Sequence, residues 1–253
     1  MNIVSLGRPD TGLGKFGALR TAQHKPSLTF IYKGVLGFFK LSLSFWYNRI
    51  MLLDIVILPP KEIRSRIGLQ MKKEVGNSLN YFVVDNKKLI PHLSLWHLRT
   101  SEKRLPKIIG GLKQVVKNQK PIKISSSGFR DLGKFKGCVT FRVKNNKSME
   151  VLQDKVFKNI YHHKTGMMPS FALFLRLQST KKKLKEVKKY GRELGFHPHF
   201  TMGWLKNKKD VLKIVKNMQK VKFNFLAKEI YICEIDKWWQ VKRIIKKVSF
   251  PLK

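Results

Sequence analysis

The stretches His92-Leu93-Ser94-Leu95 and His199-Phe200-Thr201-Met202 repeat one pattern: a histidine, an apolar residue, a hydroxyl residue and another apolar residue. Both follow a proline, in a chain with seven histidines in total. Strand side chains alternate between two faces, so on a strand each histidine shares a face with its hydroxyl residue. Two such strands would offer an acid, a base and two hydrogen-bond donors to one anionic group, as a phosphodiester requires. We therefore predict that the two stretches form one site.

The patterns on either side of these stretches predict strands and helices in alternation. Strands are predicted at 52–58, 81–84, 89–98, 122–129, 138–143, 171–177, 199–205, 230–235 and 241–248. Helices are predicted at 63–75, 105–116, 149–160, 184–194 and 211–218. Asp85-Asn86 is predicted to be a turn, which would make His92 part of a hairpin. Alternating elements with a repeated strand motif indicate the α+β class.

With these motifs the chain resembles the two-histidine (2H) phosphoesterase superfamily, which includes the 2′-5′ RNA ligases and the RNA 2′,3′-cyclic phosphodiesterases. The resemblance covers about residues 51–250. It is supported by 52–60, similar to the family's opening strand, and by 128–143, similar to its central hairpin. The resemblance implies a bilobal α+β fold with pseudo-two-fold symmetry. Two antiparallel-rich sheets would carry helices on the outside, with the motif strands facing each other across a central cleft.

The resemblance also implies an activity, the metal-independent hydrolysis of 2′,3′-cyclic phosphate ends of RNA or nucleotides to 2′-phosphates. His92 and His199 would be the catalytic acid and base, and Ser94 and Thr201 would bind the phosphate oxygens. An imidazole titrates near pH 6.5, so one neutral and one protonated histidine can coexist without a metal or cofactor. Which histidine is the acid, and whether the reverse ligating direction is used, stay open.

Residues near the motifs are weaker candidates. Trp96 shares the alternation face of His92 and Ser94, so it is a candidate for stacking on a base, with packing at a strand end as the alternative. Many relatives carry Phe-Pro-Arg near the central hairpin. Lys136 is a candidate phosphate contact there, although the sequence departs from that pattern. The alternation places His97 on the opposite face from His92.

Composition sets the remaining expectations. A chain of 253 residues can form one main domain, and its net charge of +38 favours a polyanionic partner such as RNA. The alternative is lysine-rich, solvated helix faces, and a non-catalytic basic RNA-binding protein on the same fold is the rival function. Cys138 and Cys233 form no metal-binding pattern, so no metal site is predicted. We expect reduced cysteines, a cytoplasmic location and a monomer.

Residues 1–50 lie outside the resemblance and are treated as a separate extension before a 2H phosphoesterase domain at 51–253. The extension is basic and partly apolar, but Lys33, Lys40 and Arg49 interrupt its apolar stretch, so no stable membrane insertion is expected. It could be an interfacial helix, a targeting segment or an unstructured extension, and translation could also begin at Met51. A membrane-surface protein using this segment is a third functional hypothesis.

Overall fold

The computed structural model describes residues 49–131, 137–168, 185–186, 189–190 and 196–251, all within one compact unit spanning 42–253. The strands are β1 Ile50–Ile57, β2 Asn80–Val83, β3 Leu93–Ser101, β4 Ile122–Asp131, β5 Cys138–Val143, β6 His199–Leu205, β7 Asn224–Ala227, β8 Glu229–Ile235 and β9 Val241–Ser249. The helices are α1 Lys61–Val75, α2 Leu105–Val116, α3 Lys147–Ile160 and α6 Lys208–Met218. The extension predicted at 1–50 and the strand predicted at 171–177 lie outside the described residues, except for positions 49 and 50.

The four helices form for local reasons that the sequence contains. In α1, Ile67, Met71 and Val75 repeat at helical spacing and are buried, and Pro60 stands just before the first turn. In α3 and α6 the N-cap is an asparagine, whose side chain accepts a hydrogen bond from a backbone N–H of the first turn. These helices therefore begin close to the predicted positions.

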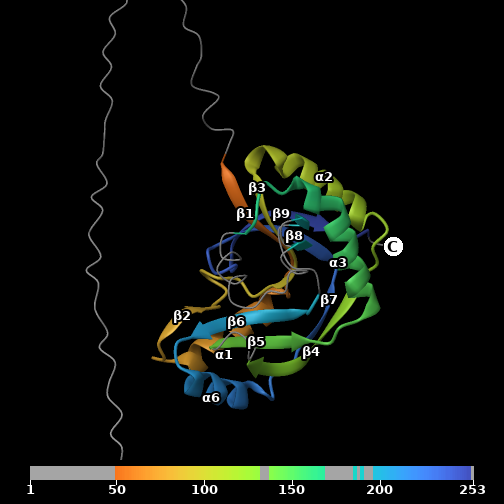
Figure 1. Cartoon of the computed structure of the whole chain (residues 1–253). Helices are drawn as coiled ribbons and strands as arrows, with labels where there is room; N and C mark the ends of the chain where they lie inside the picture. Colours follow the sequence, from red (N-terminus) through yellow and green to blue (C-terminus); the bar gives the residue numbers. More distant parts are fainter. Residues whose placement is uncertain (1–48, 132–136, 169–184, 187–188, 191–195, 252–253) are drawn as a thin grey trace, which may run out of the picture. The chain divides into compact units, whose positions relative to one another are not determined.

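The strands form one antiparallel sheet in the order β7-β4-β5-β6-β3-β1-β8-β9, with β2 added beside β6. The sheet is curled into a half-barrel (Figure 1). The prediction of the α+β class is confirmed. The prediction of two separate sheets is corrected, because the strands form the two halves of one continuous hydrogen-bonded sheet. The prediction of a hairpin containing His92 is also wrong, because β2 pairs with β6 and not with β3.

Helices pack on both halves of this sheet. The α2 and α3 helices contact each other, with α3 against β3 and α2 against β9. The α1 and α6 helices contact each other, and α6 packs on β4, β5 and β6 (Figure 1). The main hydrophobic core lies between the helices and one face of the sheet, and it includes Trp96, Phe141 and Phe200. Full burial of such a side chain contributes about 1.5–3 kcal/mol.

The strand order is symmetric about the pair β6 and β3. Outward from that pair, β5 corresponds to β1, β4 to β8 and β7 to β9. The two histidine motifs open the two central strands, so the repeated sequence pattern occupies equivalent positions in the two halves. The predicted pseudo-two-fold relation is therefore present in the strand topology.

The segment that leads into the first motif is anchored by Asp85. Its Oδ1 accepts hydrogen bonds from the backbone N–H groups of Lys87, Lys88 and Leu89 at 2.9, 2.8 and 3.2 Å. Helix α1 approaches the same segment closely at Gly68, where an added Cβ would stand 2.8 Å from the Asp85 carbonyl carbon. Partial burial by itself would raise the pKa of Asp85, but the backbone donors outweigh it and the pKa is lowered.

Replacing Asp85 by alanine is expected to lower the free energy of unfolding by about 1–3 kcal/mol, because hydrogen bonds to an ionised acceptor are lost. A lowered folded-state pKa gives stability that is complete above the unfolded-state pKa near 3.9 and is lost as the pH falls. The difference between wild type and Asp85→Ala in urea unfolding should therefore shrink in acid. Asp154→Ala, which removes an exposed carboxylate on α3, is the control. An equal difference at neutral and acid pH would contradict this account.

Candidate active site

The two histidine motifs lie side by side. Leu93 of β3 pairs with Phe200 of β6 in antiparallel register, and both side chains are fully buried in the main core. Their motif neighbours must therefore point to the opposite face of the sheet. The structure thus brings His92, Ser94, His199 and Thr201 together on one face. The motif strands do not face each other across a cleft as predicted, because they are hydrogen-bonded neighbours.

The two motif strands pair at Leu93 of β3 and Phe200 of β6, and each of these residues lies inside its motif. The histidine and the hydroxyl residue of each motif are the chain neighbours of this pair on either side. Two imidazoles and two hydroxyl groups therefore flank one point of contact between the strands, on the same face of the sheet.

A β-bulge follows the hydroxyl residue in both motifs. Beside β1, Ser94 pairs with Val56 and Trp96 with Ile55, so Leu95 is skipped. Beside β5, Thr201 pairs with Thr140 and Gly203 with Val139, so Met202 is skipped. A bulge changes which residues share a face of the strand. Its recurrence at the same motif position shows that the two halves correspond at the level of single residues.

The two imidazoles are held in the same way. Nδ1 of His92 lies 2.8 Å from the carbonyl oxygen of Ile90, and Nδ1 of His199 lies 2.6 Å from that of His197. A carbonyl oxygen only accepts, so each Nδ1 carries a proton and donates it. Nε2 is consequently the titrating atom of both rings, and it can receive or deliver a proton.

The surroundings of His92 favour its neutral form. The side chain is 3% exposed, and this burial lowers its pKa. The negative charge of Asp54 and the hydrogen bond to Ile90 act in the opposite direction without cancelling the effect of burial. His199 is less buried. The two histidines therefore differ in solvation, which is one way to separate an acid from a base.

Asp54 of β1 is fully buried beneath the first motif. Its Oδ2 accepts a 2.6 Å hydrogen bond from Ser94 Oγ and lies 3.2 Å from His97 Nε2 and 3.6 Å from His92 Nε2. Its Oδ1 has no hydrogen-bond partner among the described residues. An ionised carboxylate at this position requires compensating positive charge. The Asp54 carboxylate raises the pKa of His92, although burial lowers that pKa by more.

The hydrogen bond to Asp54 limits what Ser94 can do. A hydroxyl group has one proton to donate, and Ser94 gives it to the carboxylate. It can donate to a phosphate oxygen only after it releases Asp54. The role predicted for Ser94 therefore requires a rotation of its side chain when substrate binds.

Two assignments made from simple alternation are wrong because of the bulge. Trp96 is 1% exposed and packs against Phe157 in the main core, so it does not share the face of His92 and cannot stack on a base there. His97 turns to the face of Ser94 and approaches Asp54. Lys136 lies outside the described residues, and its predicted role stays a prediction.

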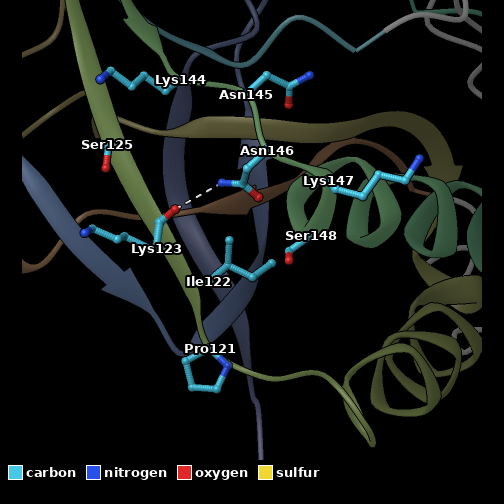
Figure 2. A pocket seen from close by; sticks show the side chains of 9 residues that line it. All are labelled: Pro121, Ile122, Lys123, Ser125, Lys144, Asn145, Asn146, Lys147 and Ser148. Atoms are coloured by element: carbon cyan, nitrogen blue, oxygen red, sulfur yellow. Dashed lines mark hydrogen bonds between the residues drawn. The ribbon is translucent and has the colours of Figure 1, made fainter.

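A basic residue that the sequence analysis missed lies beside the second motif. Arg142 of β5 pairs with His199, so it occupies the histidine face of the sheet, and its side chain is exposed. Lys123 and Lys144 line a pocket of about 420 Å³ together with residues at the start of α3. Figure 2 shows the side chains around this pocket. Strand alternation in Cys138–Val143 could have indicated Arg142, because Phe141 is apolar and Arg142 is charged.

Comparisons with known proteins identify the family of the chain and solved structures with a similar fold. Residues 81–239 match the 2′-5′ RNA ligase superfamily, and the chain belongs to this family. The fold is similar to that of TT0787 of Thermus thermophilus, with a TM-score of 0.54 and 15% identity, over 79% of this chain and 98% of that one. It is also similar to E. coli LigT complexed with 3′-AMP, with a TM-score of 0.50 and 12% identity, over 81% and 100%. Among curated proteins, none matches this chain.

Other features of the described part of the chain bear on the sequence analysis. Cys138 and Cys233 are buried and neither forms a disulfide, as expected of core residues, and burial raises the pKa of the Cys233 thiol. Within the described ranges no group of three or more His, Cys, Asp or Glu side chains could hold a metal ion. No helix in these ranges is long and apolar enough to cross a membrane.

Proposed function

We propose that this protein is a metal-independent phosphodiesterase that opens 2′,3′-cyclic phosphate ends of RNA or nucleotides and leaves a 2′-phosphate. The observation that carries the proposal is the pair of imidazoles on one sheet face, each with Nδ1–H donated to a backbone carbonyl and Nε2 as the titrating atom. Family membership supports the reaction class. The choice of a 2′,3′-cyclic phosphate as substrate is part of the proposal.

The proposed reaction needs one proton acceptor and one proton donor. Nε2 of the neutral histidine takes a proton from water as its oxygen attacks phosphorus, and the bond between phosphorus and the ribose O3′ breaks. Nε2–H of the protonated histidine delivers a proton to O3′, which leaves as a hydroxyl. The proton count is balanced, and the two histidines exchange protonation states. In ligation a 5′-hydroxyl would replace water as the nucleophile and the same bond to O3′ would break, so each histidine would keep its role. In the reverse reaction, cleavage of a 2′-5′ linkage by the 3′-hydroxyl, each histidine would take the other's role.

Charge on the non-bridging phosphate oxygens would be stabilised from both sides of the histidine pair. Thr201 and Ser94 would donate hydroxyl protons, the latter after releasing Asp54. Arg142 would add a positive charge beside His199. Asp54 is proposed as a positioning residue that controls the protonation of His92 and does not contact the substrate.

The direct test is product analysis with an RNA oligonucleotide that ends in a 2′,3′-cyclic phosphate, incubated in EDTA. Wild type is expected to produce a 2′-phosphate, whereas His92→Ala and His199→Ala are expected to leave the cyclic end intact. A product that requires added metal, or a 3′-phosphate product, would contradict the proposed chemistry.

A non-catalytic RNA-binding protein on the same fold is the second candidate. It is favoured by the net charge of +38 and by the hydrogen bond that occupies the Ser94 hydroxyl. If this is the function, the wild-type protein and both histidine variants would bind the RNA equally in the same experiment, and none of them would form product.

A further inference from the structure

Three aromatic side chains from separate segments meet at the surface. Tyr81 belongs to β2, Trp204 to β6 and Trp238 to the turn between β8 and β9. The ring centroids lie 5.5 Å apart for Tyr81 and Trp204, 5.3 Å for Tyr81 and Trp238, and 5.4 Å for Trp204 and Trp238. Tyr81 is 49% exposed, and neither tryptophan is fully buried. We call these three residues the aromatic platform.

Two lysines lie over the platform. Nζ of Lys206 is 5.6 Å from the centroid of the Tyr81 ring, and Nζ of Lys237 is 5.4 Å from that of Trp238. These distances are typical of cation–π contacts, so each lysine covers one face of its ring. A planar base that stacks on either ring would displace the flexible lysine side chain, whose ammonium group could then bind an adjoining anion.

The turn that carries Trp238 is held by hydrogen bonds from backbone N–H groups that do not involve the Trp238 side chain. Oδ1 of Asp236 accepts hydrogen bonds from the backbone N–H groups of Trp238 and Gln240 at 2.8 and 2.9 Å. The next residue, Trp239, has a φ of 62°, an uncommon conformation for a bulky side chain. Its ring lies 5.0 Å from that of His97. One turn thus directs consecutive tryptophans to the platform and to His97, which lies beside Asp54.

The platform lies on the face that carries the histidines. Thr201 and Trp204 pair with Thr140 and Cys138, which are two positions apart on β5 and so share a face. Three residues of strand separate Trp204 from Thr201 by about 10 Å. Nucleotides of one RNA strand could therefore reach the platform while the strand's end is at the histidine pair.

We infer that the aromatic platform binds unpaired bases of single-stranded RNA, with Lys206 and Lys237 on the adjoining phosphates. As an account of the substrate, this inference rests on the proposed function. Partly exposed aromatic rings next to cations are the combination that binds single strands without reading sequence. A duplex keeps its bases stacked and would not use the platform. A protein partner is disfavoured because the charged groups at the ring faces are lysines, which suit a polyanion.

The test measures binding of a short fluorescein-labelled single-stranded RNA with a 3′-hydroxyl end to the full chain. Tyr81→Ala and Trp238→Ala are each expected to weaken binding about 5- to 150-fold, because one stacked base is lost. Trp238→Phe should restore most of the affinity. Replacing both lysines by alanine should reduce the slope of log K against log salt by about 1.4. Leu226→Ala, which removes an exposed apolar side chain from β7, is the control.

Turnover separates this inference from the proposed function. Trp238→Ala should still hydrolyse a 2′,3′-cyclic mononucleotide at the wild-type rate while its KM for an RNA oligonucleotide rises. If the wild-type protein hydrolyses neither substrate, the proposed function fails. Weaker RNA binding by the platform variants would in that case still support the aromatic platform as an RNA-binding site. Three results would overturn the inference. The first is unchanged RNA affinity in both Tyr81→Ala and Trp238→Ala, and the second is an equal loss of affinity for duplex and single-stranded RNA. The third is loss of mononucleotide turnover in Trp238→Ala.

Discussion

Replacing either motif histidine by alanine is expected to lower kcat/KM for a 2′,3′-cyclic phosphate RNA about 10²- to 10⁴-fold, the usual contribution of one general acid or base. The reason is that Nε2 of each ring is the only ring nitrogen with a proton to exchange, since Nδ1 donates to a backbone carbonyl. The double variant should lose little more than either single variant, because the two groups act in one step. Single-turnover assays of product formation, with enzyme in excess over RNA but well below KM, would measure these effects.

The matched control is His197→Ala. This exposed histidine stands two residues before His199 and contributes its backbone carbonyl, which the substitution retains. The His197→Ala variant should hydrolyse the cyclic phosphate at a rate near that of the wild-type protein. A loss as large as that of His199→Ala, or near-wild-type turnover by His92→Ala, would show that the paired imidazoles are not the acid and base.

The second large effect is expected for Asp54→Asn. The carboxylate raises the pKa of His92, and burial lowers it by more, so removing the charge should lower that pKa further. Activity at neutral pH should fall roughly 10- to 100-fold, by analogy with the loss of carboxylates that orient metal-binding histidines. Asparagine has nearly the same shape and keeps an acceptor oxygen for Ser94, so the fold should be retained.

The pH–rate profile of Asp54→Asn would also assign the roles that the sequence left open. If His92 is the base, the acidic limb of kcat/KM moves to lower pH, because His92 stays neutral over a wider range. If His92 is the acid, the alkaline limb moves to lower pH, because its proton is lost earlier. Asp154→Asn, an exposed carboxylate on α3, is the control. Limbs that do not move would exclude a role for Asp54 in controlling His92.

Several parts of this fold could be predicted because their causes are local. The apolar spacing of α1, the alternation of β5 and the duplicated histidine pattern each depend on residues near one another in the chain. Strand β7 was missed, since Asn224–Ala227 is short and its three consecutive apolar residues hide the alternation of buried and exposed side chains. The hairpin expected at β2 and β3 failed for a different reason. Its turn residues are present, but β2 pairs with β6, which lies far away in the sequence.

The amino-acid sequence by itself determined the α+β class and the repeated motif, whose four polar residues are those of the proposed site. Only the tertiary structure decided that Trp96 is core, that His97 joins the site and that Asp54 lies buried beneath it. The physical reason is that a bulge is a property of two paired strands, since it exists only where one register is set against another. Burial of a carboxylate likewise depends on which distant segments cover it. Alternation along one strand contains neither kind of information, so the chemistry around the histidines followed from the fold.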